Sequence, residues 1–174
     1  MEEFRGELSR LGFQMEHLGV GYEEIQADTL EEVVEQGLRE LGERGMDNFI
    51  IDDSGLFIDA LNGFPGVYSA YALRTLGCGG ILKLMEGIEG RGAHFKCCIG
   101  ARIQGVGEII VCDVAKGEIT EEKRGGGGFG FDPIFRPEGE PRTYAEMSLD
   151  EKNRISHRGM AIRSFSRKLE ERMD

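Results

Sequence analysis

The sequence lacks any apolar run that approaches the roughly 18 residues of a membrane span, and its first residues show no basic segment followed by an apolar one. It therefore indicates neither a membrane protein nor a secreted one, and we expect a cytoplasmic protein with no membrane partner. Internal repeats are also lacking, and the glycines follow no fixed period. Repeat and collagen-like architectures are thereby excluded.

Basic residues are few, since 21 lysines and arginines stand against 32 acidic residues, for a net charge of −11 at pH 7. A nucleic-acid-binding protein needs a basic surface that displaces counterions, so this balance excludes nucleic acid as a partner. A small polyanionic ligand requires locally concentrated cations or a bridging divalent metal. The cations concentrate in the C-terminal quarter, at Lys152, Arg154, Arg158, Arg163, Arg167 and Lys168.

Cysteine is scarce as well, and no C-x-x-C spacing occurs among Cys78, Cys97, Cys98 and Cys112. Zinc-thiolate and redox motifs are therefore not indicated. We expect all four cysteines to be reduced and buried, as is usual in a cytosolic protein. Because Cys97 and Cys98 are adjacent, an extended strand would point them to opposite sides.

What the sequence does contain fits a single α/β domain over residues 1–174. Its apolar content of 40% suffices for a core, and no change in composition marks a linker. Helical and strand patterns alternate, and short links between the middle strands predict a mixed sheet. Thr29 is the expected N-cap of the second helix. We expect helices at 1–11, 29–45, 68–76, 79–86 and 156–172, and strands at 13–20, 49–51, 93–103, 107–115 and 117–122.

Two acidic residues follow a short apolar run at 49–51. This run has the pattern of a buried strand, and Asp52 and Asp53 would lie at its C-terminal end, where open α/β sheets usually hold their sites. Glu24 could add a carboxylate from another segment. Magnesium takes one or two protein carboxylates together with waters and substrate phosphates, so Asp53 with Glu24 would suffice. The alternative is a solvated turn in an acidic protein.

Four glycines at 125–128 precede Phe129, Gly130, Phe131 and Asp132. No Lys-Ser/Thr pair follows the glycines, so this is not a Walker A loop. An aromatic ring here could stack on a nucleobase while Asp132 accepts a hydrogen bond from the base or fixes the loop. The alternative is a mobile hairpin loop.

A basic segment follows, in which Ser156 is a plausible N-cap of the last helix. A helix N-terminus surrounded by Lys152, His157 and Arg158 would bind an anion or a carbonyl group well. The alternative is a solvated surface, and His157 could equally be a structural histidine.

With these motifs in order, the sequence resembles the Ham1-like inosine triphosphate pyrophosphatases over nearly its whole length. The motifs are Asp52-Asp53-Ser54-Gly55-Leu56, Gly63-Phe64-Pro65-Gly66-Val67-Tyr68-Ser69, Gly127-Gly128-Phe129-Gly130-Phe131-Asp132-Pro133-Ile134-Phe135, Ala145-Glu146-Met147-Ser148 and Glu151-Lys152-Asn153-Arg154-Ile155-Ser156-His157-Arg158. The resemblance implies hydrolysis of ITP, dITP or XTP to the monophosphate and pyrophosphate with Mg²⁺. It also implies a homodimer, and an elongated mixed sheet with helices on both faces and two lobes around a nucleotide-binding cleft.

The resemblance also implies roles for individual residues. Asp53 looks like the catalytic acidic residue, which holds metal or takes a proton from the attacking water, and Glu24 looks like the second metal ligand. Lys152 would also shield the departing pyrophosphate. Hypoxanthine and xanthine carry a carbonyl at position 6, to which Arg158 could donate, whereas adenine carries an amino group. The residues implied to bind substrate are Ser54, Phe129, Gly130, Phe131, Asp132, Lys152, His157 and Arg158.

The family normally opens with a strand and a phosphate-binding loop that contains a lysine, and residues 1–174 match only the tail of that motif, at Glu3 and Phe4. One expectation is therefore a truncated form of an active enzyme. A second is a natively short protein that binds purine nucleotide without efficient catalysis, and a third is an interaction protein with an idle cleft.

Overall fold

The computed structural model describes residues 5, 8–10, 12–17, 19–22 and 25–173. Five strands form one sheet in the order β2-β1-β3-β4-β5, in which β1 pairs antiparallel with β2 and β4 pairs antiparallel with β5. The elements are α2 (Leu30–Glu43), β1 (Phe49–Ile58), η1 (Asp59–Leu61), β2 (Pro65–Gly66), α3 (Ser69–Thr75), α4 (Gly77–Leu84), β3 (Gly92–Ile103), β4 (Gly107–Ile119), η2 (Asp132–Ile134), β5 (Phe135–Pro137), η3 (Tyr144–Glu146), α5 (Leu149–Ile155) and α6 (His157–Met173).

The expected α/β class, with one sheet and several helices, is confirmed. Among the described residues, no helix is both long enough and apolar enough to cross a bilayer. The predicted lobes around a cleft and the single domain over 1–174 stay predictions.

The contacts of the chain gather in two compact units. The first unit contains residues 1–53, 97–113 and 158–174, and the second contains residues 54–96 and 114–157. Strands β1, β3 and β4 each contribute residues to both units. The boundaries between the units include the peptide bonds Asp53–Ser54 and His157–Arg158, which lie within the predicted site motifs.

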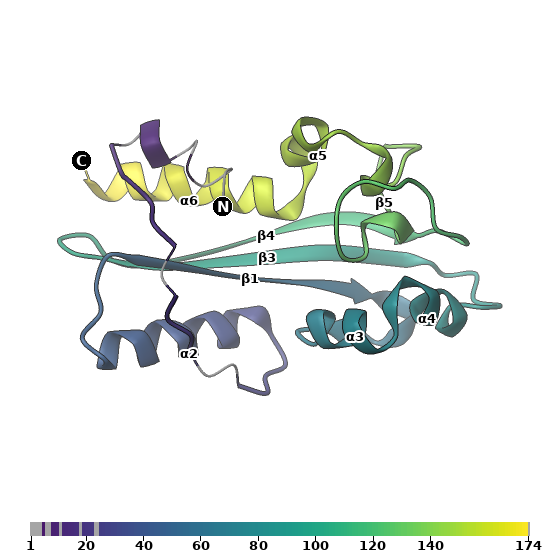
Figure 1. Ribbon diagram of the computed structural model, residues 1–174, viewed down its shortest axis with the longest axis horizontal. Helices are drawn as coiled ribbons and strands as arrows, with labels where there is room; N and C mark the ends of the chain where they lie inside the picture. The colour runs from purple at the N-terminus through teal and green to yellow at the C-terminus, as the bar shows by residue number, and fades with distance from the viewer. Residues whose placement is uncertain (1–4, 6–7, 11, 18, 23–24, 174) are drawn as a thin grey trace. The chain divides into compact units, whose positions relative to one another are not determined.

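In the first unit, α2 and α6 cover opposite faces of the strands (Figure 1). On one face, Phe165 of α6 belongs to a buried cluster with Cys97 and Ile99 of β3. On the other face, Gly100 lies against α2, because a Cβ at this position would be 3.1 Å from Leu38 Cδ1. The residues of β3 thus alternate between the two helices, as a pleated strand requires.

Helix α2 forms because its apolar residues recur on one face and its first turn is capped. The Thr29 hydroxyl accepts a hydrogen bond from the Glu32 amide at 3.3 Å, and the Glu32 carboxylate accepts one from the Thr29 amide at 3.0 Å. These bonds satisfy amides that have no helical partner. The predicted N-cap is confirmed, and the residues expected to face inward are all buried: Leu30, Val33, Val34, Leu38 and Leu41.

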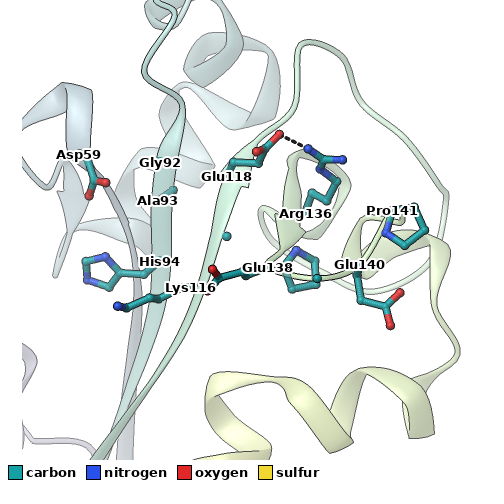
Figure 2. A pocket seen from close by; sticks show the side chains of 13 residues that line it. Asp59, Gly92, Ala93, His94, Lys116, Glu118, Arg136, Glu138, Glu140 and Pro141 are labelled. Carbon is teal, nitrogen blue, oxygen red and sulfur yellow. Dashed lines mark hydrogen bonds and ion pairs between the residues drawn. The ribbon is translucent and has the colours of Figure 1, made fainter.

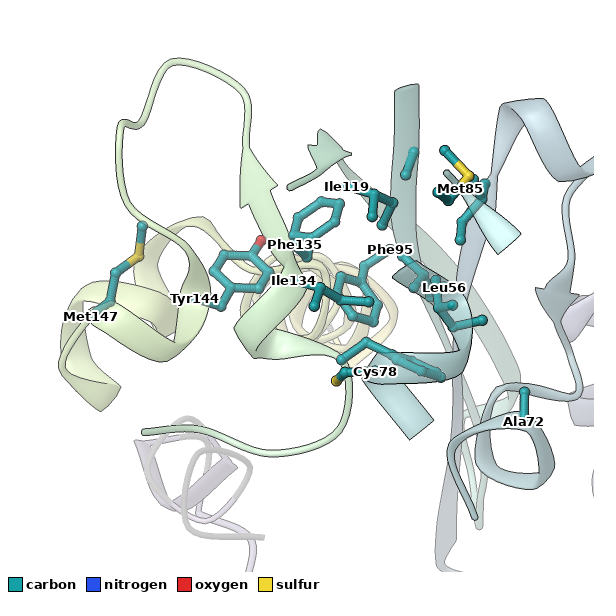
Figure 3. Close-up of a cluster of buried hydrophobic side chains, with 14 residues drawn as sticks. Leu56, Ala72, Cys78, Met85, Phe95, Ile119, Ile134, Phe135, Tyr144 and Met147 are labelled. Carbon is teal, nitrogen blue, oxygen red and sulfur yellow. The ribbon is translucent and has the colours of Figure 1, made fainter. Parts of the chain in front are cut away.

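The core of the second unit has aromatic rings at its centre (Figure 3). Phe95 of β3 meets Phe135 of β5 edge-on with ring centroids 4.7 Å apart, and Tyr144 lies 5.1 Å from Phe135. Apolar residues of β1, α3 and α4 complete this cluster, including Leu56, Ala72, Ile81 and Met85. The core therefore joins the β3–β4–β5 part of the sheet to the segment that precedes α5.

Two predicted strand boundaries are wrong. The strand predicted at 49–51 does not end before the acidic residues, because β1 continues through Asp52 and Asp53 to Ile58. The strands predicted at 107–115 and 117–122 form the single strand β4, which ends at Ile119. Gly117 does not mark a turn there. It allows a close approach instead, since a Cβ at Gly117 would lie 2.6 Å from the Phe135 ring.

Of the two elements expected in residues 1–20, the strand is wrong and the helix falls mostly outside the described residues. The strand expected at 13–20 does not form among the described residues of that segment. Phe13 and Met15 are only half-buried and the other described residues are exposed, so the segment lacks the buried face of a strand. The helix expected at 1–11 falls mostly outside the described residues, although 8–10 are helical and Leu8 is buried.

Cys98 and Cys112 form a disulfide, so the expectation of four reduced thiols is wrong for this pair. Their Cα atoms lie 4.1 Å apart on the neighbouring strands β3 and β4. The two residues are 14 apart in the chain, and only the register of the strands brings them together. Cys78 and Cys97 are buried thiols outside this disulfide, as expected.

Candidate active site

The residues predicted to act on substrate divide between the two units. Asp53 and Arg158 belong to the first unit, whereas Ser54, the Phe129–Asp132 segment, Lys152 and His157 belong to the second. Glu24, the predicted second metal ligand, lies outside the described residues.

In the first unit, the adjacent acids of β1 point to opposite faces of the strand. Ile51 faces α2, because a Cβ at Gly37 of that helix would lie 2.7 Å from Ile51 Cδ1. Strand alternation therefore places Asp53 on the α2 face and Asp52 on the opposite face. Asp52 Oδ2 accepts a hydrogen bond from Arg158 Nη2 at 2.9 Å, and both side chains are half-buried. The two neighbouring carboxylates consequently have different surroundings.

In the second unit, a tight turn presents Phe129. The Asp132 carboxylate accepts a hydrogen bond from the Phe129 amide at 2.8 Å, and the Asp132 amide donates to the Phe129 carbonyl at 3.2 Å. Gly128 has φ 68°, and a Cβ there would collide with the Asp132 carboxylate. The glycine-rich run thus ends in a defined loop, and Phe129 at its end is 62% exposed.

A buried ion pair supports this loop. Lys152 Nζ donates to Asp132 Oδ2 at 2.5 Å, and the two side chains are only 6% and 3% exposed. The same ammonium lies 4.1 Å from the centroid of the Phe129 ring and 5.5 Å from that of Tyr144. Burying both charges costs desolvation energy, which their attraction and the extra hydrogen bond to Asp132 offset. The arrangement fixes an exposed aromatic face above a cation.

His157 and Tyr144 lie beside this group in the second unit. The His157 ring stacks on Phe95 with centroids 4.7 Å apart and planes 10° from parallel, and the residue is buried. Burial, and secondarily the charge of Asp132, raises the pKa of Tyr144 well above its ordinary value, so its hydroxyl stays protonated. Ser54 is half-buried on β1 and is the first residue of the second unit.

Tyr144 lies beside Lys152, and the sequence interpretation did not include it among the site residues. A signal was present in the pattern Thr143-x-x-Glu146. The Glu146 carboxylate accepts a hydrogen bond from the Thr143 amide at 2.7 Å, which closes a capping box around η3. The cap holds Tyr144 in the core beside Lys152.

A cavity of about 820 Å³ also lies in the second unit, but it contains none of the predicted site residues (Figure 2). Its charged lining is mixed, with an ion pair of 2.5 Å between Arg136 and Glu118. Burial lowers the pKa of His94, the charge of Asp59 opposes this shift, and Lys96 and Lys116 add to it. The mixed charge does not single out one class of ligand.

Comparison with known proteins gives the class first. Residues 1–168 match the Ham1 family, and the chain belongs to that family.

The chain is 53% identical over 174 residues to the dITP/XTP pyrophosphatase of Thermococcus kodakarensis, with 99% of this chain and 93% of the relative covered. It is 51% identical to the dITP/XTP pyrophosphatase of Pyrococcus horikoshii, over 91% of this chain and 84% of that protein. Among solved structures it is similar to the Ham1 protein of Staphylococcus aureus, with a TM-score of 0.80, 33% identity, and 87% and 81% of the two chains covered.

Proposed function

We propose that this chain is a dITP/XTP pyrophosphatase, which hydrolyses dITP, XTP and ITP to the nucleoside monophosphate and pyrophosphate. The observation that carries this proposal is the 53% identity over 174 residues to a relative of that activity. The ordered Phe129 loop supports it, because its exposed aromatic ring offers a surface on which a base can stack. Removal of deaminated purines from the nucleotide pool would be the role of this reaction.

The base is assigned to the second unit. The exposed ring of Phe129 offers a stacking surface, and the Lys152–Asp132 pair holds that ring in place. Gly130 and Phe131 complete the turn that carries it. Donors that face a carbonyl at position 6 of hypoxanthine or xanthine would be left unpaired by adenine, which disfavours ATP strongly. We assign this donor role in the second unit to backbone amides of the loop, and we propose Arg158 of the first unit separately as a donor to the substrate.

We assign to the carboxylate of Asp53 the role of holding the magnesium that accompanies the substrate phosphates. Its oxygen atoms are the hard ligands that Mg²⁺ prefers, and one or two such carboxylates suffice when substrate phosphates complete the shell. Bound magnesium would supply charge neutralisation for the pyrophosphate that leaves. Asp53 would accept a proton from the water that attacks the α-phosphorus, since the products are a monophosphate and intact pyrophosphate. Asp52 has a separate function in this scheme, because it orients Arg158 through their ion pair.

The decisive test replaces Asp53 by asparagine. Asp53→Asn should reduce pyrophosphate release from dITP with Mg²⁺ by at least about 10²-fold, because proton acceptance and charge are lost while size is kept. The control is Asp47→Asn, which removes the same charge from a surface ion pair with Arg102. Turnover of Asp53→Asn within a few-fold of the wild type would refute the assigned role. A wild-type chain that binds dITP without releasing pyrophosphate would instead favour the binding-only alternative.

Two further proposals concern the oligomeric state and the cellular location of the protein. We expect a homodimer, which sedimentation equilibrium of the full chain would test, and a cytoplasmic location.

A further inference from the structure

A carboxylate and two sulfur atoms meet in the first unit, and none of the three belongs to a residue assigned to substrate. Glu31 lies in the first turn of α2, Cys98 on β3 and Cys112 on β4, and their donor atoms all lie within 4.8 Å of one another. Within the part of the chain that the structure describes, this is the one group of three or more His, Cys, Asp or Glu residues so close together.

The strand pattern shows why these side chains converge. Gly100 lies against α2, and Cys98, two residues earlier on β3, shares that face by strand alternation. Cys97 has the opposite orientation and packs in the α6 cluster. Only one of the two adjacent cysteines therefore reaches the carboxylate of Glu31.

We propose that Glu31, Cys98 and Cys112 form a redox-gated binding site for a thiolate-binding divalent metal such as zinc. In the disulfide the two sulfur atoms are bonded to each other and are poor ligands. As thiolates they would join the Glu31 carboxylate in a three-ligand site that a water molecule completes to a tetrahedron. Thiolate ligands select zinc over magnesium, so this site differs in kind from an all-oxygen magnesium site.

The gating step is a thiol–disulfide exchange with a dithiol reductant. A thiolate of the reductant attacks Sγ of Cys112, which is half-buried, and the Cys98 thiolate departs. The second thiol of the reductant then attacks the mixed disulfide and releases Cys112, so that the reductant becomes a disulfide and the protein gains two thiols. Zinc binding displaces their protons.

The distances suit such a change. Zinc–sulfur bonds of about 2.3 Å at the tetrahedral angle place two ligand sulfurs about 3.8 Å apart, which side-chain rotation of opposed cysteines can reach. The Cα atoms of Cys98 and Cys112 are 4.1 Å apart, so no backbone rearrangement is required. Cys98 is fully buried, whereas Glu31 and Cys112 are half-buried and give the ion a route of entry.

The test compares the full chain in its oxidised form with the chain reduced by a phosphine, which is then removed under argon. Each form is mixed with zinc alone, freed of excess metal by gel filtration and analysed for bound zinc, while alkylation and mass measurement count the thiols. The reduced chain should retain one equivalent of zinc and the oxidised chain none. Cobalt substituted into the reduced chain should give the intense visible bands of tetrahedral thiolate coordination.

Variants distinguish this site from adventitious binding. Cys112→Ser should abolish zinc retention, and Glu31→Gln, which keeps the disulfide, should weaken zinc binding at least about tenfold. Cys97→Ser is the matched control and should bind zinc as the wild type does. The proposal is overturned if the reduced chain retains no zinc, if both redox forms retain it equally, or if Cys97→Ser loses as much as Cys112→Ser. Unchanged affinity in Glu31→Gln would remove Glu31 from the site.

Discussion

The Asp132 side chain acts at three points of the Phe129 loop. It accepts a hydrogen bond from the Phe129 amide and pairs with Lys152. It also leaves no room for a Cβ at position 128, where the residue is glycine. A buried ion pair contributes little net stability when its desolvation is counted, and losing one partner is costly. We therefore interpret the pair as a device that selects one loop conformation.

This interpretation predicts the effect of a single methyl group. Gly128→Ala should raise the KM for dITP roughly tenfold or more, because alanine at φ 68° is strained by about 1 kcal/mol and its Cβ would displace the Asp132 carboxylate. Steady-state pyrophosphate release measures this effect. Gly126→Ala is the control, since a Cβ at Gly126 meets nothing within 4 Å. Equal KM values for the two variants would show that the loop geometry does not matter for binding.

For individual residues, the sequence predicted the kinds of side chain in the loop better than it predicted which side chains form ion pairs. The exposure of Phe129 and the burial of Asp132 are compatible with the expected stacking loop. The ion pair of Asp132 with Lys152 spans 20 residues, and no periodicity relates positions so far apart. The same holds for Arg158 and Asp52, which are 106 residues apart.

Among the elements, α5 begins with a capping box that titrates. The Glu151 carboxylate accepts hydrogen bonds from the Ser148 amide at 2.9 Å and from the Ser148 hydroxyl at 2.8 Å. These bonds, with the ion pair to Arg142, lower the pKa of Glu151 from 4.5 to about 2. A lowered pKa means that the cap stabilises the fold above the ordinary pKa and stops doing so as pH falls through about 2.

Glu151→Gln should therefore lower the denaturation midpoint at pH 7, and its deficit relative to the wild type should shrink as the pH falls from 4.5 toward 2. Chemical denaturation followed by circular dichroism at several pH values measures both trends. Glu170→Gln, at an exposed position late in α6, is the control and should show no comparable deficit at pH 7. A deficit for Glu151→Gln that is constant from pH 7 to pH 3 would contradict the assignment of the cap.

The elements that could be predicted are those whose signals are local. Helix α2 carries both its apolar periodicity and its cap within a single segment. Strand β1 was predicted too short because Asp52, Asp53 and Gly55 together have the composition of a turn. They remain in the strand because Asp52 pairs with Arg158 and because β2 pairs with the strand beyond Gly55, at Leu56 and Phe57. Both reasons are tertiary.

For the whole molecule, charge is the property that most constrains function. The net charge is −11, and two of the cations expected to receive phosphates are already paired with acids, Lys152 with Asp132 and Arg158 with Asp52. Less positive charge is therefore available than the sequence suggested. A triphosphate would bind such a protein mainly as its magnesium complex.

This balance predicts that magnesium, and not only the base, governs nucleotide affinity. With calcium in place of magnesium to slow turnover, dITP at about 100 times its dissociation constant should stabilise the wild-type chain by about 2–3 kcal/mol. The same dITP with a chelator, and ATP with the same metal, should give far smaller shifts of the thermal midpoint. Scanning calorimetry at fixed nucleotide concentration measures all three. Equal shifts with metal and with chelator would mean that the protein's own cations suffice for the triphosphate, and would contradict the role given to Asp53 as a metal ligand.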